Sequence, residues 1–325
     1  SYSDTARLTF NDTTAPDPGQ ITNASIAKTH KAKGQIRLML ADSTHSNLQG
    51  YHLYRSGKQQ PFQKVATIST SSGRQIQFID SGLNTRKSAH QYYLKPFDSC
   101  GNLAIPADTH QTIYLQANPE NGYNQISLTA YHGKAMKSYL LQRKVRGSGT
   151  WESIHQLTGN QFQYNDSNVQ CQVTYQYRII GKPRNNSLQS YSNIDTARVY
   201  ENTPPNQPKI RKASVIKTGI AQGGIILDWQ APAADDAKHF ILERSMTGRN
   251  FNILDTLSVT DYTDTGLNTY QHAYHYRLKV LDSCGNASQY SNTHKTIQLN
   301  VEGGNEVINL QWNSYEGQEV QAYQV

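Results

Sequence analysis

The sequence of 325 residues has no run of about 18 or more apolar residues, so we expect no helix that spans a membrane. Its first residues are polar and acidic, which does not fit a secretory signal peptide. Charged residues make up only 17% of the chain and hydrophobic residues only 36%, so a large catalytic core with buried helices is not expected. Tyrosine is abundant, with 21 residues, and such aromatic content argues against intrinsic disorder. Several small β-domains with thin cores fit this composition.

Motifs of catalytic and metal-binding sites are also missing. The sequence contains no G-x-S-x-G, H-E-x-x-H or Walker motif, and no pair of carboxylates has a spacing that indicates acid–base catalysis. The cysteines form no C-x-x-C pair and have no zinc-ligand spacing; they are Cys100, Cys171 and Cys284. We therefore expect no enzymatic activity, no cofactor and no structural metal.

Two further metal hypotheses are weaker than their structural alternatives. His110 and His294 occupy equivalent strand positions, and we interpret them as exposed strand residues rather than as ligands. Asp235 and Asp236 lie in a loop and could contribute to a calcium site. Calcium takes about six to eight oxygen ligands, however, and only two carboxylates are visible there.

The positive charge of the chain is spread out. The net charge is +7, and the densest basic stretch, at 209–217, is interpreted as one face of a strand. The basic residues form no stripe interleaved with exposed aromatic residues, so a nucleic-acid partner is not expected.

An internal repeat organises the chain. The sequence DSCGN at 98–102 returns 184 residues later at 282–286, and DSGLN at 80–84 returns as DTGLN at 264–268. A second kind of module lies between these copies, because YHG at 131–133 recurs as YEG at 315–317. We predict an excerpt of a longer tandem array: the last strand of a preceding module at 1–10, a long module at 11–116, a short module at 117–201, a long module at 202–300, and the start of a further short module at 301–325.

Each module shows the pattern of antiparallel strands. Apolar and polar residues alternate in short segments such as 225–229, 240–244 and 274–280, with turn signals between them. About seven such strands in about 95 residues indicate an immunoglobulin-like sandwich. No helix of ordinary length is expected.

Particular residues make the modules similar to fibronectin type III domains. A strand ends at Trp229, a strand with Phe240 follows, and the sequence YHYRL at 274–278 comes after it. The resemblance implies that Tyr274 and Tyr175 are corner tyrosines whose hydroxyls bond to the backbone. In the first module His90 stands at this position, and it can still donate a hydrogen bond. The fold class is therefore all-β, with tandem immunoglobulin-like (fibronectin type III) β-sandwiches in an extended array.

Alternation of these modules, with DSCGN followed by a Tyr-Ser-Asn sequence, resembles the tandem repeats of large Bacteroidota surface proteins. Those proteins end in a gliding-motility-associated C-terminal domain and leave through the type IX secretion system. The resemblance implies a non-catalytic, extracellular stalk or adhesin region at the bacterial cell surface. Its partners would be neighbouring modules of the same chain, surface glycans, or cell-surface and secretion proteins. Candidate O-glycosylation sites in Asp-Ser/Thr sequences are Thr5, Thr13, Ser43, Thr196 and Thr256.

Two alternative functions stay open from the sequence. The chain could be the accessory fibronectin-like region of a secreted enzyme, or a carbohydrate- or protein-binding module in its own right. Paired tyrosines at 92–93, 175–177 and 274–276 would suit a sugar-stacking platform. Their regular place in every module favours core and cross-strand packing instead.

A disulfide between Cys171 and Cys284 is expected within this fold. An exported chain meets oxidising conditions, so an unpaired thiol is disfavoured. Cys284 lies in the loop between the last two strands of its module, and Cys171 lies in an earlier turn of the preceding one. In a head-to-tail array these two loops are neighbours, whereas Cys100 would pair with the equivalent cysteine of a preceding module. Three free thiols are the alternative.

Overall fold

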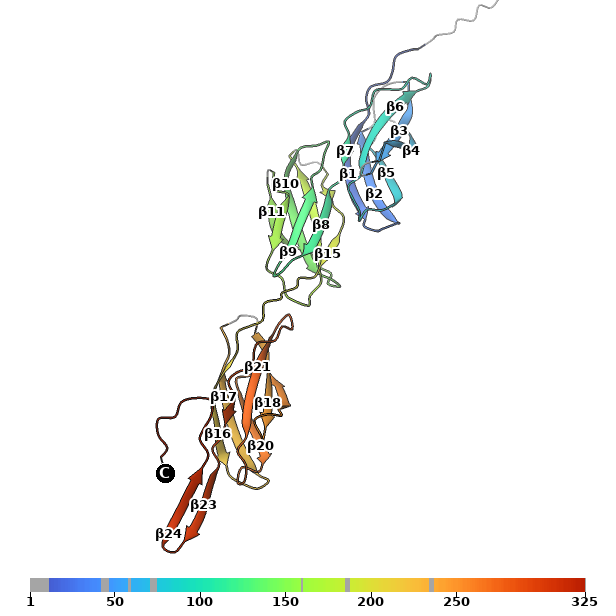
Figure 1. Cartoon of the computed structure of the whole chain (residues 1–325). Coiled ribbons are helices and arrows are strands. Elements are labelled where there is room, and N and C mark those ends of the chain that lie inside the picture. The colour runs from blue at the N-terminus through green and yellow to red at the C-terminus, as the bar shows by residue number, and fades with distance from the viewer. Residues whose placement is uncertain are drawn as a thin grey trace, which may run out of the picture. The chain divides into compact units, whose positions relative to one another are not determined.

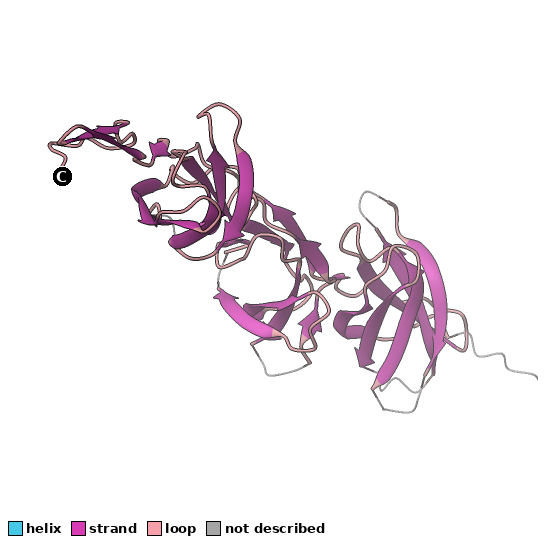
Figure 2. Cartoon of the chain, turned by 90° about the horizontal axis from the view of Figure 1, so that it is seen from below, coloured by secondary structure: helices cyan, strands magenta, loops and turns pink. Residues whose placement is uncertain are grey.

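The computed structural model describes residues 12–41, 47–57, 60–70, 75–158, 160–184, 188–233 and 237–324. Every regular element in these ranges is a β-strand, as Figure 2 shows. The chain forms two compact units, one of residues 1–169 and 173–199, and one of residues 170–172 and 200–325. The predicted strand at 1–10 lies outside the described residues.

The first unit begins with a seven-stranded sandwich (Figure 1). One sheet has the order β1-β2-β5 and the other β4-β3-β6-β7, all antiparallel. Buried and half-buried residues alternate strictly along β2 and β6, because one face of each sheet packs on the core. The strands are β1 (Gln20–Lys28), β2 (Gly34–Ala41), β3 (Leu48–Ser56), β4 (Gln63–Ser69), β5 (Ile76–Leu83), β6 (Gln91–Asp98) and β7 (His110–Gln111).

A second sandwich completes this unit. Its sheets have the orders β12-β9-β8 and β11-β10-β13, and β14 and β15 both pair with β13. The predicted boundary between residues 116 and 117 falls inside β8, which starts at Tyr114 because its backbone pairs with β9. The strands are β8 (Tyr114–Pro119), β9 (Asn124–Thr129), β10 (Met136–Val145), β11 (Glu152–Leu157), β12 (Gln163–Asp166), β13 (Tyr175–Pro183), β14 (Ser190–Tyr191) and β15 (Asp195–Ala197).

The second unit repeats the topology of the first sandwich, with sheets β16-β17-β20 and β19-β18-β21-β22. A hairpin of β23 and β24 follows, and every residue of these two strands is exposed. The predicted boundary at 300 and 301 falls inside β23. The strands are β16 (Lys209–Lys217), β17 (Gly223–Gln230), β18 (Ala237–Ser245), β19 (Asn252–Leu257), β20 (Asp261–Leu267), β21 (His275–Asp282), β22 (His294–Lys295), β23 (Leu299–Gly304) and β24 (Val307–Trp312).

An ion-pair network with a buried aspartate and a buried tyrosine recurs in all three sandwiches. In the second, Arg143 donates to both carboxylate oxygens of Asp166 at 2.9 Å, and the Tyr177 hydroxyl donates to the same carboxylate at 2.9 Å. The tyrosine of each network is completely buried. The prediction that the paired tyrosines belong to the core is therefore confirmed for these three, whereas Tyr93, beside Tyr92, is half-buried. The equivalent groups are Arg55, Asp80 and Tyr92 in the first sandwich, and Arg244, Asp264 and Tyr276 in the third.

The position of the corner tyrosine forms a hydrogen bond to the backbone whether it holds tyrosine or histidine. The Tyr274 hydroxyl accepts a hydrogen bond from the Asn268 backbone N–H at 3.1 Å. In the first sandwich the His90 Nε2 lies 3.2 Å from the backbone oxygen of Asn84, at the equivalent position. The histidine ring nitrogen donates its hydrogen bond, whereas the tyrosine oxygen accepts one. The corner is therefore hydrogen-bonded to the backbone in both sandwiches.

Candidate functional site

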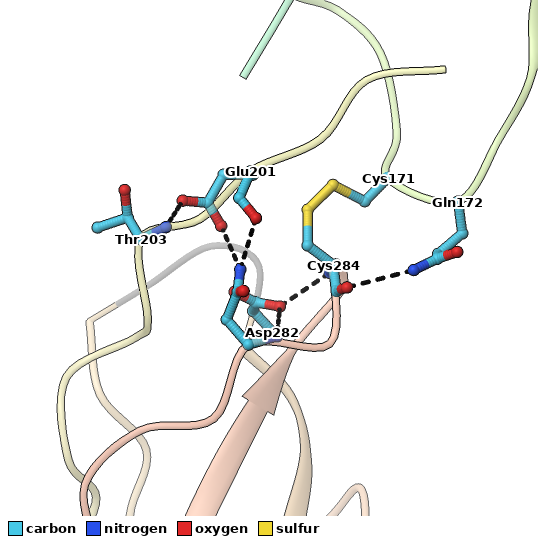
Figure 3. Close-up of a disulfide and its surroundings, with 7 residues drawn as sticks. Cys171, Gln172, Glu201, Thr203, Asp282 and Cys284 are labelled. Carbon is cyan, nitrogen blue, oxygen red and sulfur yellow. Dashed lines mark hydrogen bonds between the residues drawn. A yellow bond between two sulfur atoms is a disulfide. The ribbon is translucent and has the colours of Figure 1, made fainter. Parts of the chain in front are cut away.

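A disulfide joins two loops that are far apart in the sequence (Figure 3). Cys171, between β12 and β13, is bonded to Cys284, in the loop after β21. Their α-carbons are 5.0 Å apart, inside the limit of about 7 Å that disulfide geometry sets. Gln172 adds a hydrogen bond from its side-chain amide to the Cys284 backbone oxygen at 3.2 Å. The bond joins the pair of cysteines that the sequence suggested.

The loop that carries Cys284 is held by its own side chains. Asp282 accepts hydrogen bonds from the backbone N–H groups of Cys284 and Asn286, both at 2.8 Å. The Asn286 side-chain amide donates to Asp282 at 2.8 Å and to the Glu201 carboxylate at 2.9 Å. Glu201, Asp282 and Cys284 offer three ligand atoms close together. The amide of Asn286 bridges the two carboxylates and the sulfur is in the disulfide, so this cluster is a structural loop rather than a metal centre.

The first sandwich contains the same loop with a free cysteine. Asp98 accepts from the backbone N–H groups of Cys100 at 2.9 Å and Asn102 at 2.8 Å. The Asn102 side-chain amide donates to Asp98 at 2.8 Å and to the Asp12 backbone oxygen at 2.9 Å. Cys100 is exposed and unbonded. Its partner on a preceding module stays a prediction.

A buried histidine–tyrosine pair joins the two sandwiches of the first unit. The Tyr131 hydroxyl, from the loop between β9 and β10, lies 2.8 Å from His110 Nδ1 of β7. The same oxygen accepts the backbone N–H of Ala24 in β1 at 3.0 Å, and the Tyr131 backbone N–H donates to the Tyr139 hydroxyl at 3.1 Å. One tyrosine therefore ties both sheets of the first sandwich to the second.

The second unit builds the same pair from His294, before the β23–β24 hairpin, and Tyr315, after it. Tyr315 lies 2.7 Å from His294 Nδ1 and accepts the Ala213 backbone N–H at 3.1 Å. Its backbone N–H donates to the Tyr323 hydroxyl at 3.0 Å. The repeat in the sequence thus reproduces a whole hydrogen-bonded junction and not only a set of strands.

The prediction that both histidines are exposed is wrong. His110 and His294 are 5% and 0% exposed, because the tyrosine loop covers the face of the strand that period two alone leaves open. Burial lowers the pKa of each to about 4, with the Lys134 charge adding to the effect at His110. Each imidazole is therefore neutral at pH 7, and its Nδ1 can accept a hydrogen bond from the tyrosine hydroxyl.

This packing explains why the third position of the Tyr-x-Gly motif is glycine. Gly133 has a φ of 95°, and a β-carbon there would lie 2.6 Å from the His110 ring. Gly317 has the same left-handed backbone, with a φ of 115°, against His294. Glycine is the one amino acid that adopts this left-handed backbone readily and, without a β-carbon, leaves room for the histidine ring.

Further contacts in the first unit are polar and buried. Asn23 of β1 donates to Ser190 Oγ at 2.9 Å, and Ser25 accepts the Tyr191 backbone N–H at 2.9 Å. The Ile194 backbone N–H donates to Thr29 Oγ1, just after β1, at 2.8 Å. The contact between the two sandwiches thus includes several specific hydrogen bonds between named side chains and backbone groups. The sequence does not reveal these residues, because the alternation of apolar and polar residues marks a strand but not which strand faces a neighbouring module.

The remaining predicted sites lie on the surface or outside the described residues. Thr13, Thr196 and Thr256 are exposed, as a modified hydroxyl must be. Thr5, Ser43, Asp235 and Asp236 are outside the described residues. In the described part of the chain, no helix is long and apolar enough to cross a membrane.

No protein-family model matches the chain, and no curated protein is significantly similar to it. Among solved structures, the crystal structure of the chicken CNTN1 FN1–FN3 domains is similar at 12% sequence identity and a TM-score of 0.28. The match covers 87% of this chain and 98% of that chain. The first and third sandwiches each have a three-stranded and a four-stranded sheet, and the second has a three-stranded and a five-stranded sheet, as expected for immunoglobulin-like β-sandwiches.

Proposed function

We propose that this chain belongs to a non-catalytic, extracellular array that acts as the stalk or adhesin shaft of a secreted bacterial surface protein. The observation that carries the proposal is the repeated histidine–tyrosine junction, which recurs with the same partners in both units. A spacer has to keep its modules in register, and buried hydrogen bonds between modules do this better than a free linker. The resemblance to Bacteroidota surface repeats supports the same proposal.

The disulfide supports an exported location. Stable disulfides form in oxidising compartments, and the bond between Cys171 and Cys284 has the α-carbon spacing of a structural disulfide. The exposed Thr13, Thr196 and Thr256 would be reachable by a glycosylating enzyme in such a location. Added hexose in the intact mass of the native protein would identify the modification, and an unmodified mass would remove it.

Replacement in the native protein tests the spacer function. Exchanging these modules for the same number of unrelated fibronectin type III modules should retain cell-surface attachment, whereas deleting them should reduce it. Loss of attachment in both variants would contradict a spacer and favour a specific binding role.

A substrate screen tests the absence of catalysis. The isolated chain should turn over no polysaccharide, peptide or ester. Specific hydrolysis that a single carboxylate or serine substitution abolishes would instead make it part of an enzyme.

A further inference from the structure

A groove of about 630 Å³ runs between the two sandwiches of the first unit. Phe62 and Tyr114 stand in its walls, and amides and hydroxyls form most of the rest. Lys87 is the one charged side chain among the described residues that line it. The volume lies within the range of small-ligand sites, about 300–1,000 Å³.

Two glutamines on the groove wall are pre-oriented. Gln91 donates from its side-chain amide to the Gln111 side-chain oxygen at 2.9 Å, and Gln111 donates to the Ala130 backbone oxygen at 3.2 Å. Each amide carries two N–H groups, so each keeps a second donor for a ligand. Fixed amide donors and acceptors of this kind suit a ligand that is rich in hydroxyl groups.

An aromatic surface continues from the groove onto the outer face of β3 and β6. Phe62 lies 4.7 Å from the ring of Tyr93, and Tyr93 stacks on Tyr54 at 4.8 Å with an interplanar angle of 14°. All three rings are half-buried. The Lys95 ammonium lies 5.7 Å from the Tyr54 ring, near the outer limit of a cation–π contact.

The same positions differ in the other two sandwiches. Tyr54 and Tyr93 are a cross-strand pair, and the equivalent pair in the third sandwich is Glu243 and Arg277, which form an ion pair at 2.7 Å. Arg277 also covers the ring of Phe251, the equivalent of Phe62, at 4.1 Å. The second sandwich carries Gln142 and Arg178 as the equivalent pair, with Arg178 over Trp151 at 4.3 Å. A guanidinium thus covers the aromatic ring in these two sandwiches, and a second aromatic ring takes its place in the first.

The equivalent groove of the second unit is also charged. Its lining includes Arg249, His275, Lys295 and Glu316, and the last two form an ion pair at 3.2 Å. At these equivalent positions, uncharged amides and stacked rings are therefore particular to the first sandwich and are not a general feature of the fold.

We propose that this groove and the adjoining aromatic face bind a neutral oligosaccharide. The C–H face of a pyranose ring carries slight positive charge and packs on the negative face of an aromatic ring. The hydroxyls at its edge would pair with Gln91 and Gln111. A polyanionic chain would need a basic cluster, and the groove contains a single lysine. This binding site goes beyond the spacer function and does not depend on it.

Titration calorimetry on the full oxidised chain tests this proposal, with neutral hexasaccharides of glucose, xylose and mannose as probes. We expect at least one of them to bind. The variant Tyr54→Glu with Tyr93→Arg installs the pair that the third sandwich tolerates, so it should fold, and it should weaken binding by about tenfold or more. Tyr290→Ala removes an aromatic ring of the third sandwich, which lies over Arg277, and should leave binding unchanged.

Three results would overturn the proposal. One is no binding of any neutral hexasaccharide, and another is equal binding by the double variant. The third is binding of hyaluronan or of a proline-rich peptide, but of no neutral sugar, that the double variant abolishes. A spacer without sugar affinity would still pass the replacement experiment, so the two proposals fail separately.

Discussion

The Arg143–Asp166 pair gives the sharpest stability prediction, through the substitution Asp166→Asn. The side chains of Arg143 and Asp166 are 9% and 2% exposed, so the change removes the buried counter-charge of a buried guanidinium. Its remaining carboxylate partner is Glu152, which lies 3.2 Å away and is 67% exposed. Removing one partner of a buried ion pair costs about 3–5 kcal/mol. Arg55 and Arg244 are 29% and 30% exposed, so water can solvate them when their aspartates are changed. There we expect about 1.5–3 kcal/mol, the value of hydrogen bonds to a charged group.

Hydrogen exchange measured by mass spectrometry can assign these losses to single sandwiches, because unfolding of a multi-domain chain is not one transition. In Asp166→Asn, protection should fall in β10 and β13 and stay unchanged in the second unit. The double variant Arg143→Met with Asp166→Leu removes both charges and should recover most of the loss. An equal loss in all three sandwiches, or a loss below about 1 kcal/mol for Asp166→Asn, would refute the burial argument.

Three further predictions concern the junctions and the thiols. The pKa of His110 is about 4 when folded and 6.5 in the unfolded chain, so the unfolded state binds more protons between these values. Stability should therefore be complete above pH 6.5 and fall by up to about 3 kcal/mol as the pH drops to 4; melting temperatures should show this slope in the native chain and a flatter one in His110→Gln. Tyr131→Phe removes the acceptor of the Ala24 N–H and should cost about 1–3 kcal/mol by urea unfolding, whereas an effect below about 0.3 kcal/mol would contradict the junction role. An alkylating reagent should label Cys100 without reductant, and Cys171 and Cys284 only after reduction; labelling of all three thiols at once would rule out the disulfide.

The sequence predicts the strands well because a strand is marked by residues that are neighbours in the sequence. Alternation of apolar and polar residues marks the core face of a strand such as β6, and the repeat identifies equivalent turns. The Arg–Asp–Tyr networks could have been found from the same repeat, because Arg55, Asp80 and Tyr92 all recur. What links them is burial in the core, which spacing along the chain does not reveal.

The junctions could not be predicted in the same way. His110 has the sequence context of an exposed strand residue, and only the folded loop with Tyr131 covers it. Tyr93 looked like one more core tyrosine beside Tyr92. Only the pairing of the strands shows that Tyr93 lies on the outer face and that Arg277 occupies the equivalent position in the third sandwich.

Surface labelling of the intact bacterium tests the proposed extracellular array most directly. An antibody raised against this chain should bind cells that have not been permeabilised, and an external protease should remove that signal. Binding only after permeabilisation, with full resistance to external protease, would contradict the account.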